Sequence, residues 1–415
     1  MNSSNRWVRR KLSDAYWFQE GPGVRRWQFT NSGIKLLNVA NITQRGTLDL
    51  IKTDRYLGEE EVEQRYKHFL IDEGDLVIAS SGISFDLDGF LRTRGAFVCR
   101  EHLPLCMNTS TIRFKSKEGV SDLGFLKFWL DSFEFRDQIT RHVTGSAQQN
   151  FGPSHLKSTW ITLPPLPEQK RIAVILAKAD RLRRLRRYAL ELGDTYLQSV
   201  FLEMFGDPIK NPRGWDVSSI EQVLSKSRGG TRTGPFGSSL KRGEYVEYGI
   251  PVWGIDNVRG NEFVEEGSLF ITSLKYRQLS RYAIEDGDIL ISRAGTVGRM
   301  CVARPTQSPS IIGTNLVRVT VDTSVLLPEY FTALFTYFAS SAGRLSMSSG
   351  GTAYSFVNPR TLKSLKIPLP PLYLQQRFVC TVYRLERLRA QQREAERQAE
   401  HLFQTLLHRA FRGEL

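Results

Sequence analysis

The second half of this 415-residue chain repeats the first half at an offset of 206 residues. Residues 155–166 (HLKSTWITLPPL) return as residues 361–372 (TLKSLKIPLPPL), and one register holds from Gly145 to Phe205 of the first copy. Such a period is far longer than the repeat of a solenoid protein. The chain therefore contains two related domains, each followed by a segment of its own.

The first part of each copy mixes short strand-like runs with glycine, proline and asparagine. Residues 69–79 (FLIDEGDLVIA) and 282–292 (YAIEDGDILIS) each predict two short strands around an acidic turn. Asp75 and Asp288 in these turns resemble the metal-binding acids of nucleases, but their repeated position favours a structural hairpin. An aromatic-rich helix at residues 122–143, which returns in the second copy, is expected to bury one side in a core: Phe125, Leu126, Trp129, Leu130, Phe133 and Ile139.

A long helix is predicted after each domain, at residues 168–205 and 374–411. A Leu-Pro-Pro-Leu turn precedes both helices, and proline ends the preceding strand because it fixes φ and has no N–H. Apolar residues recur at spacings of three and four, which is typical of helices that pair with each other. The predicted pairing positions are Ile172, Ile175, Leu182, Leu185 and Leu192 in the first helix, and Val382, Leu385, Leu388, Leu402 and Leu406 in the second.

These elements predict an α+β fold of two globular mixed α/β domains separated by two long antiparallel helices, with a pseudo-twofold internal repeat. The expected boundaries are 1–165 and 207–371 for the domains, and 166–206 and 372–415 for the helical segments. With one domain at each end, a helix of about 38 residues would separate the domains by about 57 Å, the length of about 15 base pairs of DNA.

The chain is strongly basic, with 57 Lys and Arg against 43 Asp and Glu, a net charge of +14 and a pI near 9.7. This excess is typical of proteins that bind a polyanion, although a basic face that docks on an acidic protein would have the same composition. The sequence shows neither a signal peptide nor an apolar run long enough to span a bilayer, so we expect a cytoplasmic protein without a membrane partner. The four cysteines form no CxxC pair and are expected to be reduced and structural.

Motifs of enzymes that act on DNA are missing from the sequence. There is no GxxxxGK[ST] loop for a nucleoside triphosphate, no GxGxxG that links a strand to a helix, and no Glu-x-Lys after either acidic turn. Both Pro-Pro pairs lie between leucines, which cannot hydrogen-bond a base amine as an adenine methyltransferase requires. The six histidines do not recur at matching positions. We therefore expect that this chain is not itself a catalyst and has no metal site.

The chain resembles the DNA-specificity subunit of Type I restriction–modification systems over essentially its full length. The features that carry this resemblance are the duplicated Leu-Pro-Pro-Leu…Gln-(Lys/Gln)-Arg segments at 163–171 and 369–377, the junction FGDPIKNPRGW at 205–215, and the loop GPFGSSL at 234–240. The first domain differs from the family in having no obvious counterpart of the GPFGSS loop.

The resemblance implies a division of labour among subunits. Each globular domain would be a target recognition domain that reads one half of a split, asymmetric sequence in double-stranded DNA. The helices would set the gap between the halves and bind two methyltransferase subunits, which carry S-adenosylmethionine. Motor–nuclease subunits, joined through the complex, would carry ATP hydrolysis with magnesium and DNA cleavage, so that no cofactor is expected on this chain.

DNA-binding residues are expected among side chains that can hold phosphates or base edges, although a solvated surface residue remains the alternative for each of them. An arginine-rich stretch of the first long helix, residues 181–187, is expected to lie opposite Glu394 and Glu396, either in ion pairs or over the spacer DNA. The candidates are Arg45, Arg92, Arg94, Gln148, Gln149 and Asn150 in the first domain, and Arg232, Lys241, Arg242, Arg259, Arg293, Arg299 and Tyr354 in the second.

The sequence also admits two other functions. One is a divergent DNA-binding nuclease that acts alone, and the other is a coiled-coil interaction protein whose charge serves only solubility. Metal-dependent cleavage by the chain alone would favour the nuclease, and failure to bind DNA in every subunit combination would favour the interaction protein. Adenine methylation of a bipartite site that depends on a partner would favour the specificity subunit.

Overall fold

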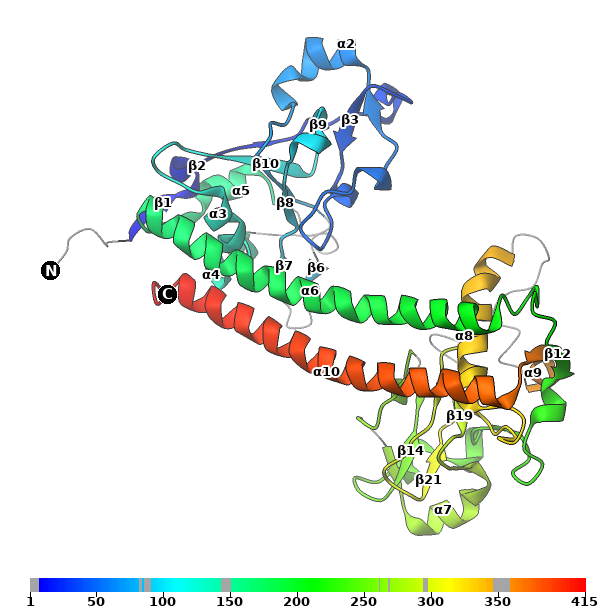
Figure 1. Cartoon of the computed structure of the whole chain (residues 1–415). Coiled ribbons are helices and arrows are strands. Elements are labelled where there is room, and N and C mark those ends of the chain that lie inside the picture. The colour runs from blue at the N-terminus through cyan, green and yellow to red at the C-terminus, as the bar shows by residue number, and fades with distance from the viewer. Residues whose placement is uncertain are drawn as a thin grey trace. The chain divides into compact units, whose positions relative to one another are not determined.

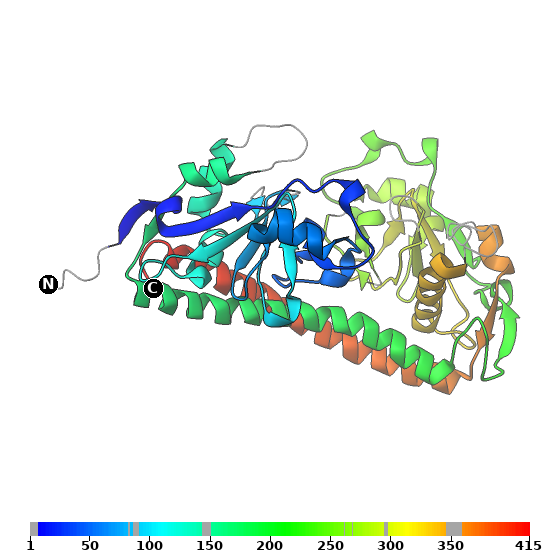
Figure 2. The ribbon, with the colours of Figure 1, turned by 90° about the horizontal axis from the view of Figure 1, so that it is seen from above.

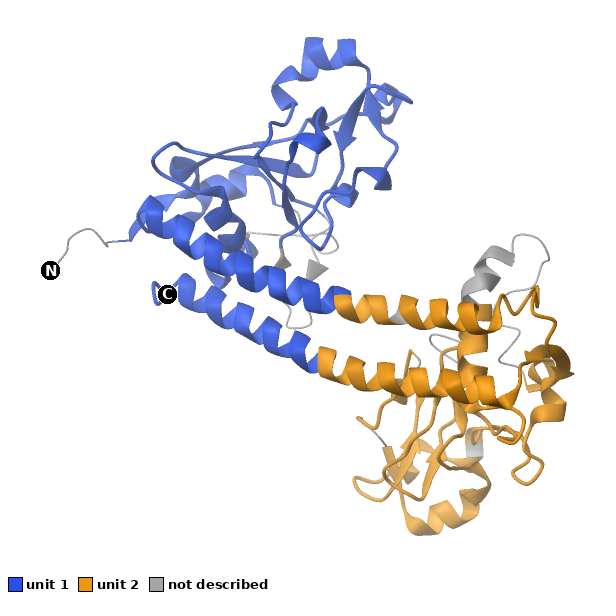
Figure 3. Ribbon diagram, in the orientation of Figure 1, with its two compact units in different colours: residues 1–188, 393–415 blue, residues 189–392 orange. Residues whose placement is uncertain are grey.

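The chain folds into two compact units, one formed by residues 1–188 with 393–415 and the other by residues 189–392 (Figure 3). We call residues 7–165 of unit 1 head one, and residues 207–371 of unit 2 head two (Figure 1). The structure is a computed structural model, and it describes residues 7–81, 84–85, 91–142, 151–260, 262–267, 269–293, 298–345 and 359–415.

Two long helices, α6 (Leu166–Phe205) and α10 (Leu372–Ala410), each contribute one stretch to each unit (Figures 1 and 3). Each helix begins two residues before its predicted start, because the Leu-Pro-Pro-Leu turn continues directly into it. Pro167 is tolerated in the first turn of α6, since the N–H groups there have no partner within the helix.

Within each unit the two helices are antiparallel. In unit 1, Arg183 on α6 contacts Glu400 on α10 at 3.1 Å, and Arg187 contacts Glu396 at 3.3 Å. In unit 2, the ring of Phe378 on α10 lies 5.6 Å from the ring of Phe201 and 5.5 Å from the ring of Phe205 on α6. In unit 1, the residue number of the partner on α10 falls as the residue number on α6 rises. In unit 2, Gly193 on α6 lies beside Leu385 and Arg389, whereas Phe201 and Phe205 lie beside Phe378, so the helices run in opposite directions there as well.

The buried face of each helix differs in part from the predicted pairing positions. Ile172 and Val382 are buried, and Ile175, Leu385 and Leu406 are partly buried. The other five leucines are not part of a buried seam, since 40–54% of each residue is exposed: Leu182, Leu185, Leu192, Leu388 and Leu402. The reason is that each head also covers the helices, so that other residues are turned inward, among them Ala173, Leu176, Ala179, Phe403, Leu407 and Ala410 in the core of unit 1.

Head one is built on a four-stranded antiparallel sheet of order β2-β10-β5-β8 and a three-stranded sheet of order β4-β3-β9, in which β3 and β9 are parallel. β1 (Val8–Lys11) pairs with β11 (Trp160–Leu163), the strand that leads into α6. The remaining strands are β2 (Tyr16–Glu20), β3 (Ile34–Leu37), β4 (Tyr56–Leu57), β5 (Leu76–Ala79), β6 (Ser84–Phe85), β7 (Leu91–Arg92), β8 (Gly95–Phe97), β9 (Leu105–Met107) and β10 (Thr111–Ser116).

Head two repeats this strand order as β13-β22-β19-β20 and β17-β14-β21, with β18 added beside β21. β12 (Asp216–Ser219) pairs with β23 (Lys366–Leu369), as β1 pairs with β11 in head one. The duplication seen in the sequence is thus a duplication of the fold. The strands are β13 (Thr231–Thr233), β14 (Ile250–Trp253), β15 (Val258–Arg259), β16 (Glu262–Phe263), β17 (Leu269–Ile271), β18 (Ala283–Ile284), β19 (Ile289–Ser292), β20 (Met300–Val302), β21 (Ser310–Ile312) and β22 (Leu316–Val319).

The aromatic-rich helix is continuous in head two, as α8 (Pro328–Leu345), but it is broken into α3 (Leu123–Trp129) and α4 (Phe133–His142) in head one. Ser132 causes the break, since its Oγ accepts a hydrogen bond from the N–H of Phe135 and begins a new helix. Phe133 is 66% exposed, so the prediction that it faces the core is wrong. The other five predicted positions, Phe125, Leu126, Trp129, Leu130 and Ile139, are buried.

Shorter helices connect the strands of each head. Figure 2 shows the ribbon from above, with the same colours as Figure 1. In the described part of the chain, none of the helices has the length and apolar character needed to cross a bilayer. The shorter α-helices are α1 (Leu12–Ala15), α2 (Glu59–Glu61) and α5 (Pro153–Ser158) in head one, and α7 (Ser273–Leu279) and α9 (Pro359–Ser364) in head two.

A fully buried glutamine attaches each long helix to its head. Gln169 Oε1 accepts a hydrogen bond from the N–H of Asp122, and its Nε2 donates to the carbonyls of Val120 and Pro164, all at 2.9 Å. Gln375 makes the same three contacts in head two: it accepts from the N–H of Leu327 at 2.9 Å and donates to the carbonyls of Val325 at 3.0 Å and Pro370 at 2.9 Å. The amide thus bonds both the loop before the core helix and the proline turn.

We predict that Gln375→Ala destabilises the protein by about 2–4 kcal/mol, because the substitution leaves one N–H and two carbonyl groups buried without partners. The adjacent Gln376 is exposed, so Gln376→Ala serves as a matched control and is expected to change the free energy of unfolding by less than about 0.5 kcal/mol. Urea unfolding followed by circular dichroism measures both variants. Equal stability of the two variants would contradict the assigned role of Gln375.

Candidate nucleic-acid interface

The acidic turns of both heads are structural hairpins, as predicted. The N–H of Asp72 donates to Asp75 Oδ2 at 3.0 Å, and the N–H of Glu285 donates to Asp288 Oδ2 at 2.8 Å, so each aspartate closes its own turn. Arg113 lies 3.6 Å from Asp75, and Arg228 lies 2.8 Å from Asp288. These carboxylates are occupied by the fold and are not directed at a ligand.

A buried arginine lies next to each acidic turn and binds a backbone carbonyl near it. Arg113 donates to the carbonyl of Leu70, and Arg318 donates to the carbonyl of Ala283. Burial lowers the pKa of both arginines, and the charges of Asp75 and Asp288 oppose this shift. Among the described residues, His, Cys, Asp and Glu side chains form no group of three or more that could hold a metal ion. Burial also raises the pKa of the Cys106 and Cys301 thiols to about 12, and all four cysteines are free.

A glycine at the end of one strand positions a loop in the same way in both heads. A Cβ on Gly234, which opens the GPFGSS loop after β13, would lie 1.9 Å from the carbonyl oxygen of Gly313. A Cβ on Gly21, after β2, would lie 2.1 Å from the carbonyl oxygen of Asn108. Both glycines are followed by proline, so the segment Gly21-Pro22-Gly23 is the structural counterpart of the GPFGSS loop that the sequence comparison missed.

Two candidate arginines, Arg94 and Arg299, occupy equivalent positions. The carbonyl of Arg94 accepts from the N–H of Ala79 at 2.9 Å, and the carbonyl of Arg299 accepts from the N–H of Ser292 at 2.8 Å. Each arginine therefore lies next to the end of the central strand, β5 or β19, in the hairpin that leads to β8 or β20. Arg299 is exposed and Arg94 is partly exposed.

The structure brings three further candidates of head two close to the GPFGSS loop. The guanidinium of Arg293 lies 5.3 Å from the ring centre of Phe236 in that loop. Lys241 and Arg242 follow the loop, and both are exposed. Arg293 thus lies against the GPFGSS loop, and Lys241 and Arg242 follow the same loop in the sequence.

The other candidates of head two are engaged with protein groups or lie outside the described residues. Arg259 lies 3.5 Å from Glu266 in an exposed ion pair. Arg232, on β13, is directly opposite Arg318 on β22 and only partly exposed, and its buried Nε has no hydrogen-bond partner among the described residues. Tyr354 lies outside the described residues.

Fewer candidates of head one can be placed. Arg45 is exposed, and its guanidinium lies 5.7 Å from the ring centre of Tyr188 on α6. Arg92 belongs to β7, and its side chain is not described. Gln148, Gln149 and Asn150 lie outside the described residues.

The arginine-rich stretch of α6 forms interhelical ion pairs, but only one of the two predicted glutamates takes part. Arg187 contacts Glu396 at 3.3 Å, and Arg183 contacts Glu400 at 3.1 Å. Glu394 instead pairs with Arg397 of its own helix at 2.8 Å. The prediction is confirmed for Glu396 and wrong for Glu394, because two residues along a helix correspond to a rotation of about 200°, so that Glu394 lies on another side of α10 than Glu396.

A family model described as "Type I restriction modification DNA specificity domain" matches residues 29–191 and residues 212–398, once in each copy. The chain belongs to the Type I restriction–modification DNA-specificity family. As a specificity subunit, it is not itself an enzyme. This membership does not favour a nuclease that acts alone or a coiled-coil protein without DNA.

Known specificity subunits are similar to the chain over most of its length. The Type I restriction enzyme EcoKI specificity subunit of Escherichia coli K12 is 24% identical over 401 residues, which cover 91% of this chain and 81% of the relative. The S subunit of M. genitalium has a TM-score of 0.55 at 16% identity and covers 99% of this chain and 97% of its own. A chain from another type I system has a TM-score of 0.53 at 19% identity, with 100% and 99% covered. Both structures support the fold of a specificity subunit.

We predict that Gly21→Ala destabilises unit 1 by roughly 1–3 kcal/mol, because the new Cβ must displace the backbone at Asn108. Gly23→Ala is the matched control two residues away, since a Cβ there meets no atom within 4 Å. Thermal unfolding of both variants tests this. The same loss for Gly23→Ala would show that the loop, rather than the close approach at Gly21, is sensitive.

Proposed function

We propose that this specificity subunit reads a bipartite, asymmetric sequence in double-stranded DNA, with each head bound to one half. The observation that supports this most is the shared framework of the two heads, which positions different side chains at equivalent places. Arg94 corresponds to Arg299, whereas the loop after Gly21 differs from the loop after Gly234. Two heads with one framework and different surfaces would read two different half-sequences.

The charge of the chain supports contact with the DNA backbone as well as with bases. The net charge of +14 favours binding to phosphates, which supplies most of the sequence-independent affinity. Exposed Lys241, Arg242 and Arg299 are suited to this task, and an arginine that reaches a base edge can form two hydrogen bonds to guanine. Within this proposal, the candidates of both heads divide into phosphate contacts and base contacts.

The partners follow from the same proposal. Two methyltransferase subunits would bind the long helices and carry S-adenosylmethionine, and motor–nuclease subunits would join through them and carry ATP and magnesium. Exposed leucines on both helices support such docking, because side chains of this size are expected to be covered in an assembly. The complex would act in the cytoplasm, where the host DNA lies.

Exchange of head two tests the bipartite reading. Residues 207–371 are replaced by the corresponding head of the EcoKI specificity subunit, and the methylome of a host that carries the complete complex is sequenced. We expect one half of the methylated sequence to remain and the other half to change. A change in both halves, or methylation of one continuous sequence in the parent complex, would contradict the proposal.

Docking on the helices is tested by Leu185→Glu and Leu388→Glu, at positions that are 53% and 54% exposed. We expect each variant to weaken assembly with the methyltransferase subunit about tenfold or more, since covering a leucine contributes about 1.5–3 kcal/mol. The melting temperature of the free subunit should stay unchanged. Thr195→Glu, at an exposed polar position of α6, is the control, and native mass spectrometry reports how many methyltransferase subunits bind.

A further inference from the structure

We propose that Arg25 and Arg26 bind DNA phosphates beside the half-site of head one, as the counterparts of Lys241 and Arg242 in head two. This inference rests on the proposed function, and it assigns a contact to two residues that the repeat in the sequence did not reveal. Arg26 and Arg242 begin two short 3-10 turns, η1 (Arg26–Gln28) and η9 (Arg242–Glu244), and Arg25 and Lys241 directly precede these turns.

The two turns are closed by the same hydrogen bond. The N–H of Arg25 donates to Gln28 Oε1 at 2.8 Å, and the N–H of Lys241 donates to Glu244 Oε2 at 2.6 Å. In each case, the side chain at the end of the turn reaches back to the residue before it. This bond determines which residues point outward, since the closing side chain is turned back toward the backbone.

The closing side chain also fastens each turn to the neighbouring helix. Gln28 Nε2 donates to Glu61 Oε1 of α2 at 2.7 Å, and Lys275 Nζ of α7 donates to Glu244 Oε1 at 2.7 Å. The turn donates this hydrogen bond in head one and accepts it in head two. In both heads the bond joins the 3-10 turn to the next α-helix along the chain. Gln28 is buried, so its hydrogen bonds fix the position of η1 on the head.

The segments that follow the turns confirm that they are equivalent. A Cβ on Gly33 would lie 2.3 Å from the carbonyl oxygen of Leu57, and a Cβ on Gly249 would lie 2.3 Å from that of Ile271. Both glycines have positive φ, at 122° and 155°, and both directly precede equivalent strands, β3 of the β4-β3-β9 sheet and β14 of the β17-β14-β21-β18 sheet. The turns thus occupy the same place between the glycine-proline loop and this strand.

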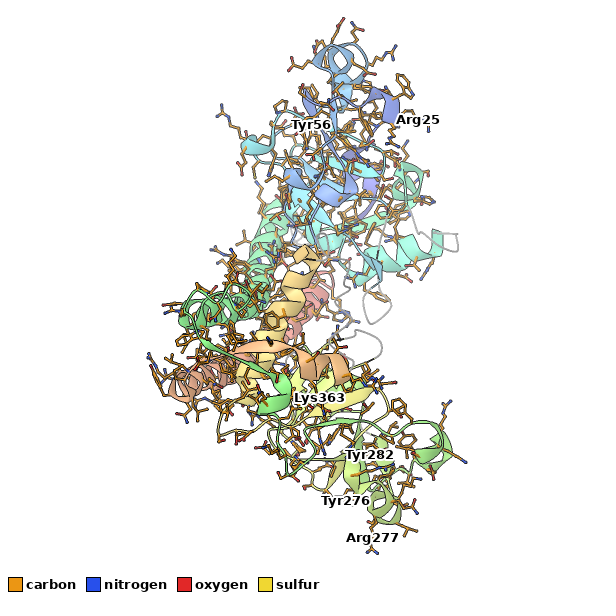
Figure 4. All side chains as sticks on the ribbon, turned by 90° about the vertical axis from the view of Figure 1, so that its right-hand side faces the viewer. Arg25, Tyr56, Tyr276, Arg277, Tyr282 and Lys363 are labelled. Carbon is orange, nitrogen blue, oxygen red and sulfur yellow. The ribbon has the colours of Figure 1, made fainter. Side chains whose placement is uncertain are left out.

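The positive charges of Arg25 and Arg26 are accessible to a ligand. Both side chains are exposed, and neither forms an ion pair with a carboxylate among the described residues. Figure 4 shows Arg25 at the surface of head one. Arg55 lies nearby, with its guanidinium 5.3 Å from the ring centre of Phe29, the residue after η1. A pair of adjacent unpaired cations on a fixed turn is suited to neighbouring phosphates.

The neighbouring helix limits where the DNA can lie. Residues 59–61 of α2 are three glutamates, whereas α7 in head two carries Lys275 and Arg277. Phosphates would be repelled by α2, so the DNA contact of head one is restricted to the outer side of η1. In head two, Lys275 is paired with Glu244, so the positive charge that α7 adds is that of Arg277, which Figure 4 shows at the edge of that head.

The double variant Arg25→Ala/Arg26→Ala tests this assignment in the complex with the methyltransferase subunits. The probe is a duplex that carries the bipartite sequence found in the methylome. We expect binding to weaken about tenfold or more near 0.1 M salt, and the slope of log K against log salt to fall by about 1.8, since each phosphate contact contributes about 0.9. Lys241→Ala/Arg242→Ala should have a similar effect.

Two control variants separate charge from structure. Arg65→Ala/Lys67→Ala removes two cations from the same head, but both are already paired with carboxylates, those of Glu61 and Glu63, and their loss should leave the slope unchanged. Arg25→Lys/Arg26→Lys keeps both charges and should retain the slope. An unchanged slope for the alanine variant, or a loss that lysine does not restore, would overturn the inference while the wild-type complex still binds its site. Failure of the wild-type complex to bind any bipartite site would instead refute the proposed function.

Discussion

The structure depends on the way a buried glutamine joins each long helix to its head. A primary amide has one acceptor and two donor hydrogens, and Gln169 uses all of these functions on backbone groups of the loop before α3 and of the proline turn. Gln375 repeats the arrangement in head two. Because each contact is made to the backbone, the sequences of the loop and of the head can change while the helix keeps its direction. A glutamate could not donate these bonds, and a leucine would leave three polar groups without partners.

This attachment explains why the two copies remain alike at one end and diverge elsewhere. Around the glutamines the repeat keeps its offset of 206 residues, but Gly21 and Gly234 are 213 residues apart, and Gly33 and Gly249 are 216 apart. Insertions have therefore accumulated in the loops between strands, while the strand order is the same in both heads. Loops outside the core can change length with little loss of stability. The surface that is proposed to read DNA is built from these loops.

Much of the architecture could be predicted from the sequence, because helices of this length and the proline turns give strong periodic signals. The hairpins around Asp75 and Asp288 were also recognisable, since an acidic residue recurred between two apolar runs. The exposure of five helix leucines could not be predicted, because the spacing of apolar residues does not show whether a head, a partner helix or solvent contacts a given face of a helix. Arg25 and Arg26 could not be predicted as candidates for another reason. Their counterparts lie at an offset of 216 residues instead of 206, and the hydrogen bonds of Gln28 and Glu244 are needed to recognise that the two turns are equivalent.

The duplication also has a consequence for the charge of the two heads. Equivalent turns need equivalent ties to the next helix, and the pair Gln28–Glu61 becomes Glu244–Lys275 in head two. When the donor and the acceptor of this hydrogen bond are exchanged, the helix residue changes from an acceptor, Glu61 of the acidic α2, to a donor, Lys275 of α7. An acidic helix directs DNA away from itself, whereas a basic helix extends the contact. Two heads that share the order of their main sheet can therefore present different electrostatic fields to DNA, in addition to the different side chains of their loops.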